Sequence, residues 1–226
     1  MSNRRLAKNI STMSIAVFIS RILGLIRDQV MAYYFGMTFL NDAFNVAYNI
    51  PNLLRRLFGE GALSSSFVPI YKEIGLKGNL NEQIDFAKKV LSLLTILLLF
   101  LVFIGILFSS FIVRIVYPGL VSQTFELSVI LLKIIFPYMF FIGISSTMIA
   151  ILNAHERFFM TGLSSALLNI GMVASIIIPA SVWHIKGTAL LIYAGWGVFL
   201  GGFLQTVVNF PYLNRPQKRL HEEPLY

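Results

Sequence analysis

The sequence predicts an all-α fold, a polytopic membrane bundle of six transmembrane helices, and three observations lead to it. Only 12% of the 226 residues are charged and 57% are hydrophobic, whereas soluble domains carry about 25% charged residues. Four stretches of 21 or more residues contain no Asp, Glu, Lys, Arg or His, and a helix needs about 20 apolar residues to cross a bilayer. Lysine and arginine are distributed unequally between the segments that join the predicted spans, which sets an orientation.

The first two predicted spans, residues 10–35 and 39–70, are long and apolar but carry charges. These charges are Arg21, Arg27, Asp28, Asp42, Arg55, Arg56 and Glu60. We do not interpret the first span as a signal peptide, because no small-x-small cleavage site follows its apolar start. A charge at the bilayer centre costs about 2.5 kcal/mol or more. We therefore expect the charged side chains to face protein or a water-filled cavity.

The later spans are predicted at residues 90–113, 130–154, 158–183 and 187–213, after an amphipathic segment at residues 81–89. With the N-terminus inside, the cytoplasmic segments hold 11 of the 18 lysines and arginines, and the outer segments hold only Arg114 and Lys186. This asymmetry predicts that both termini are cytoplasmic. The whole chain is then one transmembrane domain with no soluble part.

Polar residues recur at helical spacing in both charged spans. In the second span they fall at steps of three and four residues, which places them on one face of a helix. This stripe comprises Asp42, Asn45, Asn49, Asn52, Arg56 and Glu60, with Arg55 beside it. A narrower stripe in the first span comprises Ser14, Arg21, Gly24 and Asp28, with Arg27 beside it. The two stripes predict one wall of a hydrated cleft.

The balance of charges indicates what such a cleft binds. Together the two spans hold four arginines and three carboxylates, and guanidinium forks suit phosphate and carboxylate groups. An anionic head group such as a phosphate or pyrophosphate is therefore the expected ligand. The carboxylates would hold the arginines in the empty cleft or couple to a cation or proton. Seven charges on two helices exceed what polar contacts between membrane helices require.

Flexible positions accompany these polar residues. Pro51 removes a backbone hydrogen bond inside the second span and predicts a kink. Gly59 and Gly61 flank Glu60 and add backbone freedom, and Gly24 is a further candidate hinge in the first span. By contrast, we interpret Asn153 and Asn169 as isolated amides that pack between helices.

Several functional classes are not supported by the sequence. The chain has no cysteine, and its three histidines lie far apart, so thiol chemistry and a histidine metal site are not expected. It has no phosphate-binding loop and no catalytic constellation, so we expect neither an enzyme nor a cofactor. The net charge of +8 collects at span ends and indicates membrane topology rather than nucleic-acid binding.

Two long motifs resemble the MurJ (MviN) family of lipid II flippases, in the multidrug/oligosaccharidyl-lipid/polysaccharide exporter superfamily. They are SRILGLIRD at residues 20–28 and DAFNVAYNIPNLLRRLFGEGA at residues 42–62. Shorter matches follow at residues 67–69, 132–138 and 150–153. The resemblance implies transport of undecaprenyl-pyrophosphate-linked peptidoglycan precursor from the cytoplasmic to the periplasmic leaflet of the bacterial inner membrane.

The resemblance also implies a substrate cavity. Its arginines correspond to Arg21, Arg27 and Arg55, with Arg56 adjacent, and its acids to Asp28, Asp42 and Glu60. Asn49 stands where many members carry a lysine, and with Asn52 it belongs to the polar stripe. No nucleotide site is present, so a coupling ion or the membrane potential would drive the cycle. The expected partners are lipid II and membrane lipids.

The family has two lobes, and six spans correspond to its N-terminal lobe. We therefore expect a C-terminal lobe or a second copy of the chain to be required, because alternating access needs two lobes. Two alternatives stay open. The cargo could be another polyprenyl-linked glycan or a drug, although drug exporters prefer cations and the arginine excess argues against them. The chain could also be a truncated, non-transporting membrane scaffold in the cell-wall machinery.

Overall fold

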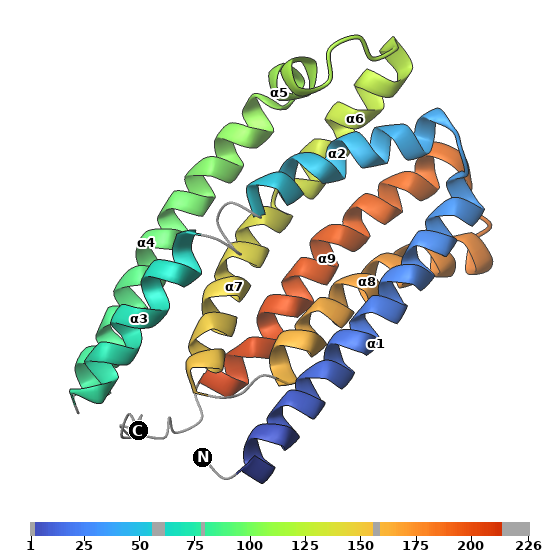
Figure 1. Ribbon diagram of the computed structural model, residues 1–226. Helices are drawn as coiled ribbons and strands as arrows, with labels where there is room; N and C mark the ends of the chain where they lie inside the picture. Colours follow the sequence, from blue (N-terminus) through green and yellow to red (C-terminus); the bar gives the residue numbers. More distant parts are fainter. Residues whose placement is uncertain (1–2, 56–61, 78–79, 156–158, 214–226) are drawn as a thin grey trace.

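The computed structural model describes residues 3–55, 62–77, 80–155 and 159–213, which fold as helices joined by short connections (Figure 1). The helices are α1 (Asn3–Phe35), α2 (Phe39–Arg55), α3 (Ala62–Leu76), α4 (Leu80–Leu107), α5 (Ser109–Val116), α6 (Ser122–Ile135), α7 (Tyr138–Ala154), α8 (Phe159–Val182) and α9 (Gly187–Leu213). No strand occurs in the described ranges. The predicted all-α class is confirmed.

The helices divide the predicted spans more finely than hydropathy does. The range 39–70 holds α2 and α3, and residues 56–61 between them lie outside the described residues. The range 90–113 holds the later part of α4 and the first half of α5, whereas the amphipathic segment 81–89 is the start of α4 itself. The range 130–154 crosses from α6 into α7, and these two helices are bent by 41° relative to each other.

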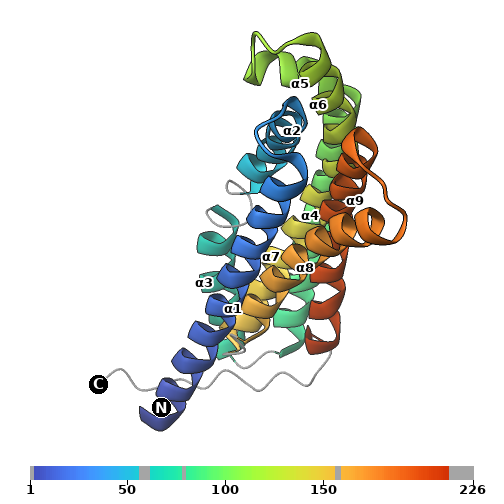
Figure 2. The ribbon, with the colours of Figure 1, turned by 90° about the vertical axis from the view of Figure 1, so that its right-hand side faces the viewer.

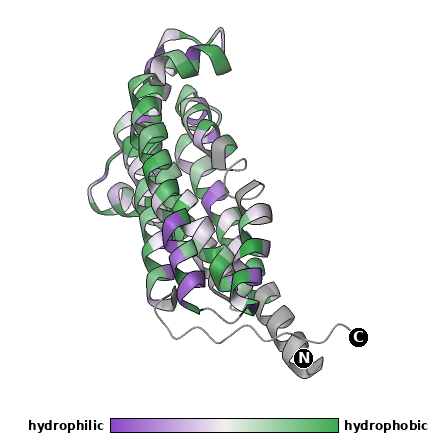
Figure 3. Cartoon of the chain, turned by 90° about the vertical axis from the view of Figure 1, so that its left-hand side faces the viewer, coloured by the Kyte–Doolittle hydropathy of each residue, from purple (hydrophilic) through white to green (hydrophobic). Residues whose placement is uncertain are grey.

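Within the described residues, two helices are long and apolar enough to cross a membrane by themselves. They are α4, with a mean hydropathy of 3.1, and residues 187–211 of α9, with 1.6. The bent pair of α6 and α7 can count as a third span. Figure 3 shows α4 apolar along most of its length and hydrophilic towards its N-terminal end. The count of six spans therefore stays a prediction.

The centre of the bundle is formed by α8 and α9, with α7 packed on α9 and α1 lying along α8. Glycines let the two central helices touch, since a Cβ at Gly171 would stand 2.9 Å from the Cα of Gly201. The main core extends from this pair to α2, α4 and α6. Its most buried side chains include Leu98, Leu131, Leu132, Ile135, Met139, Ile176 and Leu190.

A separate cluster holds α3 against α4 and α7. The fully buried Tyr71 stacks on Phe67, and its hydroxyl lies 3.0 Å from Nε2 of His155. The buried Gln83 donates to the Tyr71 carbonyl at 3.0 Å. At the exposed end of α3, a hydrogen bond from Lys77 holds the pKa of Glu73 below its usual range. The position of α3 thus depends on contacts distinct from the main core.

The first two helices diverge from a tight hairpin (Figures 1 and 2). Gly36 adopts φ +54°, a conformation that glycine reaches without steric penalty, and the Thr38 hydroxyl donates to the Phe35 carbonyl at 2.7 Å. Beyond this turn α1 follows α8, whereas α2 follows α6. The two helices that carry the polar stripes therefore contact each other only slightly.

Candidate functional site

The polar stripe of α2 lies on the open side of that helix. Asp42, Asn45 and Asn49 are exposed, and Asn52 is half-buried. The alternate positions pack into the core, with Ala43 and Ala47 fully buried. A helix buries one stripe and leaves the other accessible, so Asp42, Asn45 and Asn49 do not act as contacts between packed helices in the described part of the chain. The predicted polar face of α2 is confirmed for these residues.

Aromatic and proline contacts fix the rotation of α2. Tyr48 stacks between Phe44 and Tyr138, with ring centroids 5.7 Å and 6.5 Å away. Pro51 is buried, and α2 continues past it to Arg55. Because the buried side is held in this way, the polar side has a defined direction. The kink at Pro51 stays a prediction.

The charged residues of α1 lie on a continuous helix that passes through Gly24. Arg21 and Asp28 are exposed, and Arg21 has no hydrogen bond or ion pair with the described residues. Arg27 differs from the exposed Arg21, because its side chain is only 23% exposed. The side chain of its partner Asp28 is 63% exposed. Arg27 is thus the more enclosed of the two arginines.

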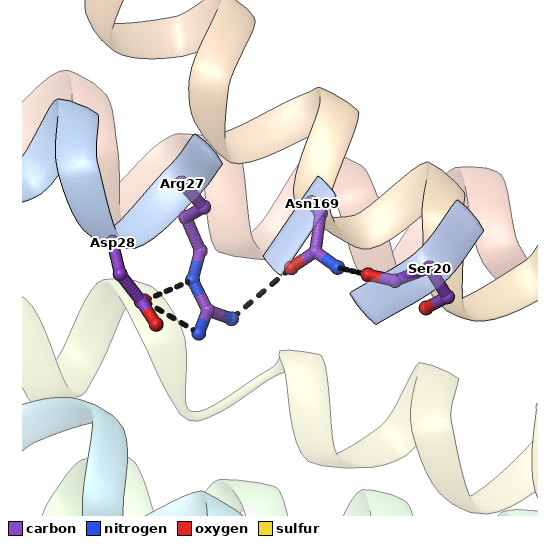
Figure 4. A network of polar contacts seen from close by, with 4 residues as sticks. All are labelled: Ser20, Arg27, Asp28 and Asn169. Atoms are coloured by element: carbon purple, nitrogen blue, oxygen red, sulfur yellow. Dashed lines mark hydrogen bonds and ion pairs between the residues drawn. The ribbon is translucent and has the colours of Figure 1, made fainter. Parts of the chain in front are cut away.

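Arg27 is held by two acceptors (Figure 4). Its Nε and Nη2 donate to Oδ1 of Asp28 at 3.0 Å and 2.8 Å. Its Nη1 donates to Oδ1 of Asn169 at 3.1 Å. A guanidinium carries five N–H donors, and these bonds use three of them. One donor on each terminal nitrogen stays without a partner among the described residues, a pair that suits a phosphate or carboxylate.

Asn169 links α8 to α1 and is the residue that sequence reasoning assigned only to packing. Besides accepting from Arg27, it donates from Nδ2 to the Ser20 carbonyl at 3.2 Å. Gly24 lies beside this amide, and a Cβ there would stand 3.8 Å from the Asn169 amide nitrogen, an ordinary contact distance. Asn169 is only 7% exposed, so its orientation is fixed. It therefore positions the Arg27 guanidinium.

Five further predicted residues lie wholly or partly outside what the structure describes. Arg55 ends α2, and the structure describes its backbone only. Arg56, Gly59, Glu60 and Gly61 lie outside the described residues. Of the predicted residues, the structure brings together Arg27 and Asp28, with Asn169. Arg21 and Gly24 lie elsewhere on α1, and Asp42, Asn45, Asn49 and Asn52 lie on α2. That all of them line one cavity stays a prediction.

An apolar hollow of about 560 Å³ lies on another face of α1, against α8. It is lined by Ile22, Leu25, Ile26, Gln29, Val30, Tyr33, Tyr34 and Ile177. No charged side chain of the described residues lines it, and an anion would lose its hydration there without a compensating partner. The Arg27 network is therefore the better candidate for an anionic group.

Comparisons with known proteins place this chain in a family. A family model described as "Lipid II flippase MurJ" matches residues 31–224. The chain is 38% identical over 208 residues to a probable lipid II flippase MurJ of Buchnera aphidicola subsp. Baizongia pistaciae, covering 91% of this chain and 40% of that protein. It is 38% identical over 212 residues to the lipid II flippase MurJ of Burkholderia cenocepacia, covering 90% and 39% respectively.

The fold agrees with the sequence comparison. A solved structure titled "Lipid II flippase MurJ, inward closed conformation" superposes with a TM-score of 0.76 at 30% identity, covering 93% of this chain and 43% of that one. The chain thus spans about 40% of the length of the curated relatives that it matches. The resemblance seen in the two motifs is confirmed, and the chain belongs to the lipid II flippase MurJ family.

Proposed function

We propose that this chain forms the N-terminal lobe of a lipid II flippase, which moves the undecaprenyl-pyrophosphate-linked peptidoglycan precursor from the cytoplasmic to the periplasmic leaflet of the bacterial inner membrane. Family membership supports the transport activity. The observation that carries the proposal is the Arg27 guanidinium, which Asp28 and Asn169 orient while two of its donors have no partner among the described residues.

The proposed mechanism assigns the anionic head group to the arginines. The open donors of Arg27 bind pyrophosphate oxygens, and Arg21, which is exposed on the same helix, adds a second charge. Asp42, Asn49 and Asn52 offer the hydrogen-bonding groups that a sugar or peptide requires, and Arg55 at the end of α2 completes the site. The lipid tail stays in the bilayer while the head group crosses.

Movement of the head group requires a second lobe, because rocking of one bundle against another exposes a site alternately to each side. A C-terminal lobe or a second copy of this chain supplies it. A coupling ion or the membrane potential supplies the energy.

The proposed membrane arrangement has six spans and both termini in the cytoplasm. The spans are α1, the pair of α2 and α3, α4, the pair of α6 and α7, α8, and α9. This order puts the hairpin at Gly36 on the outside and the start of α4 on the inside. The excess of lysine and arginine on the inner side supports it.

Thiol labelling tests this orientation, because the chain has no cysteine of its own. Met37 and Asn81 are both exposed. In spheroplasts we expect Met37→Cys to react with a membrane-impermeant maleimide at once, and Asn81→Cys to react only after the membrane is permeabilised. Labelling of Asn81→Cys in intact spheroplasts would contradict the arrangement.

The proposed activity is tested in cells depleted of their own flippase. We expect exposure of lipid II on the outer leaflet to return when this chain is expressed together with a C-terminal MurJ lobe. The chain expressed by itself is expected to leave exposure at the depleted level. No recovery from the two lobes together, despite their stable assembly in the membrane, would refute the proposed function.

A further inference from the structure

We propose that α5 is an interfacial helix, which lies in the outer boundary region of the bilayer and contacts lipid acyl chains with one of its faces. The proposal rests on the membrane arrangement given above and not on the identity of the cargo. In Figures 1 and 2, α5 lies across the end of the bundle opposite α3 and does not continue the line of α4. The break falls at Phe108, between the end of α4 and the start of α5.

The eight residues of α5, with Phe108 just before them, present three different faces. Ser109 and Val113, four residues apart, are fully buried and face the bundle. Phe108, Phe111 and Ile115 recur at the spacing of a second line, and they are 49%, 62% and 62% exposed. A third line holds the exposed Ser110 and Arg114, again four residues apart.

The two exposed lines need different solvents. Large apolar side chains in a row are unfavourable in water, whereas a guanidinium is unfavourable among acyl chains. A helix with an exposed apolar line beside an exposed polar line satisfies both when it lies along the boundary between the two. Water alone does not suit the apolar line, and acyl chains alone do not suit the polar line. The membrane interface offers water and acyl chains to the same short helix.

The exposed apolar residues of α5 follow directly in the sequence after those of α4. Leu93, Phe100 and Phe103 of α4 are 70%, 59% and 66% exposed, and Leu107 at its end is 64% exposed. Because α4 is long and apolar enough to cross a membrane, these exposed apolar side chains would face lipid in a bilayer. Phe108 and Phe111 extend this series beyond the break. Lipid is therefore the occupant that the continuation of this series identifies for α5.

Contacts with α6 hold α5 at this angle. The Arg114 guanidinium lies over the Phe125 ring, 5.6 Å from its centroid, a favourable cation–π distance. The same helix α6 packs against α2, which carries the polar stripe.

Nitroxide labels at two adjacent positions test the proposal. In the cysteine-free chain, Phe111→Cys places the label on the apolar line, and Ser110→Cys places it on the polar line as the matched control. Both sites are exposed, so neither change removes a core contact. The labelled full chain is reconstituted in vesicles of phosphatidylethanolamine and phosphatidylglycerol, and relaxation by oxygen is compared with relaxation by a water-soluble nickel chelate.

We expect the label at position 111 to sit about 5–10 Å deeper than the label at position 110, with oxygen dominating its relaxation and nickel dominating at position 110. A pair of labels that both respond mainly to nickel would place α5 in water. A pair that both respond mainly to oxygen would place it inside the hydrocarbon core. Either result overturns the proposal, and neither bears on whether the chain flips lipid II.

Discussion

Replacing Arg27 by alanine is expected to abolish the recovery of lipid II exposure in depleted cells that carry both lobes. The change removes the two open donors and also leaves the Asp28 carboxylate without the cation that now neutralises it. Hydrogen bonds to charged groups contribute about 1.5–3 kcal/mol each, and an unpaired carboxylate repels a pyrophosphate. Activity should fall by at least about tenfold at equal amounts of membrane protein.

Arg27→Lys and Arg114→Ala are the controls for this prediction. Lysine keeps the charge but not the planar fork, so Arg27→Lys is expected to retain only part of the activity. Arg114 lies in α5, away from the polar stripes, and its alanine variant should recover lipid II exposure nearly as well as the unchanged chain. An Arg27→Ala variant as active as Arg114→Ala would show that Arg27 binds no cargo.

Replacing Gly171 by valine is expected to destabilise the bundle more than any surface substitution. The α8 and α9 backbones meet there, since even a Cβ would stand 2.9 Å from the Gly201 Cα and 3.2 Å from its nitrogen. A side chain at this position forces the two central helices apart. Overpacking in a close-packed interior costs about 1–3 kcal/mol and sometimes more, and here backbone rather than a flexible side chain would have to move.

The thermal unfolding midpoint of the purified chain in detergent measures this effect. Ala189→Val is the control, because Ala189 is exposed on α9 and the two methyl groups added there meet solvent or detergent. We expect the unfolding midpoint to fall strongly in Gly171→Val and to change very little in Ala189→Val. Equal midpoints for the two variants would mean that the helices can separate at Gly171 without loss.

The polar face of α2 could be predicted because its cause is local. A helix that packs on one side repeats its buried positions every three or four residues, so Ala43 and Ala47 alternate with Asn45 and Asn49 in the sequence itself. The same periodicity placed Asp42 on the open side. Hydropathy likewise identified the apolar stretches that became α4 and α9.

The role of Asn169 could not be predicted from the sequence. Asn169 and Arg27 are 142 residues apart, and only the packing of α8 along α1 brings them together. A lone asparagine in an apolar stretch carries no signal for its partner. Gly24, which the sequence suggested as a hinge, lies beside this amide, and nothing in the sequence indicated that contact either.

Breaks within apolar stretches were missed for a different reason. A hydropathy average does not change where Phe108 separates α4 from α5, because the residues on both sides are apolar. Phe136 and Pro137 mark the bend between α6 and α7, yet the stretch around them reads as one span. The direction of each helix is set by packing, which a window average does not contain.

The measurement that tests the central claim most directly is the affinity of the purified two-lobe complex for lipid II, with and without Arg27. The claim is that Asp28 and Asn169 hold this guanidinium ready for an anionic head group. We predict that Arg27→Ala weakens binding by about tenfold or more, and that Asn169→Ala weakens it less, with both variants folded. Unchanged affinity in folded Arg27→Ala would contradict the account.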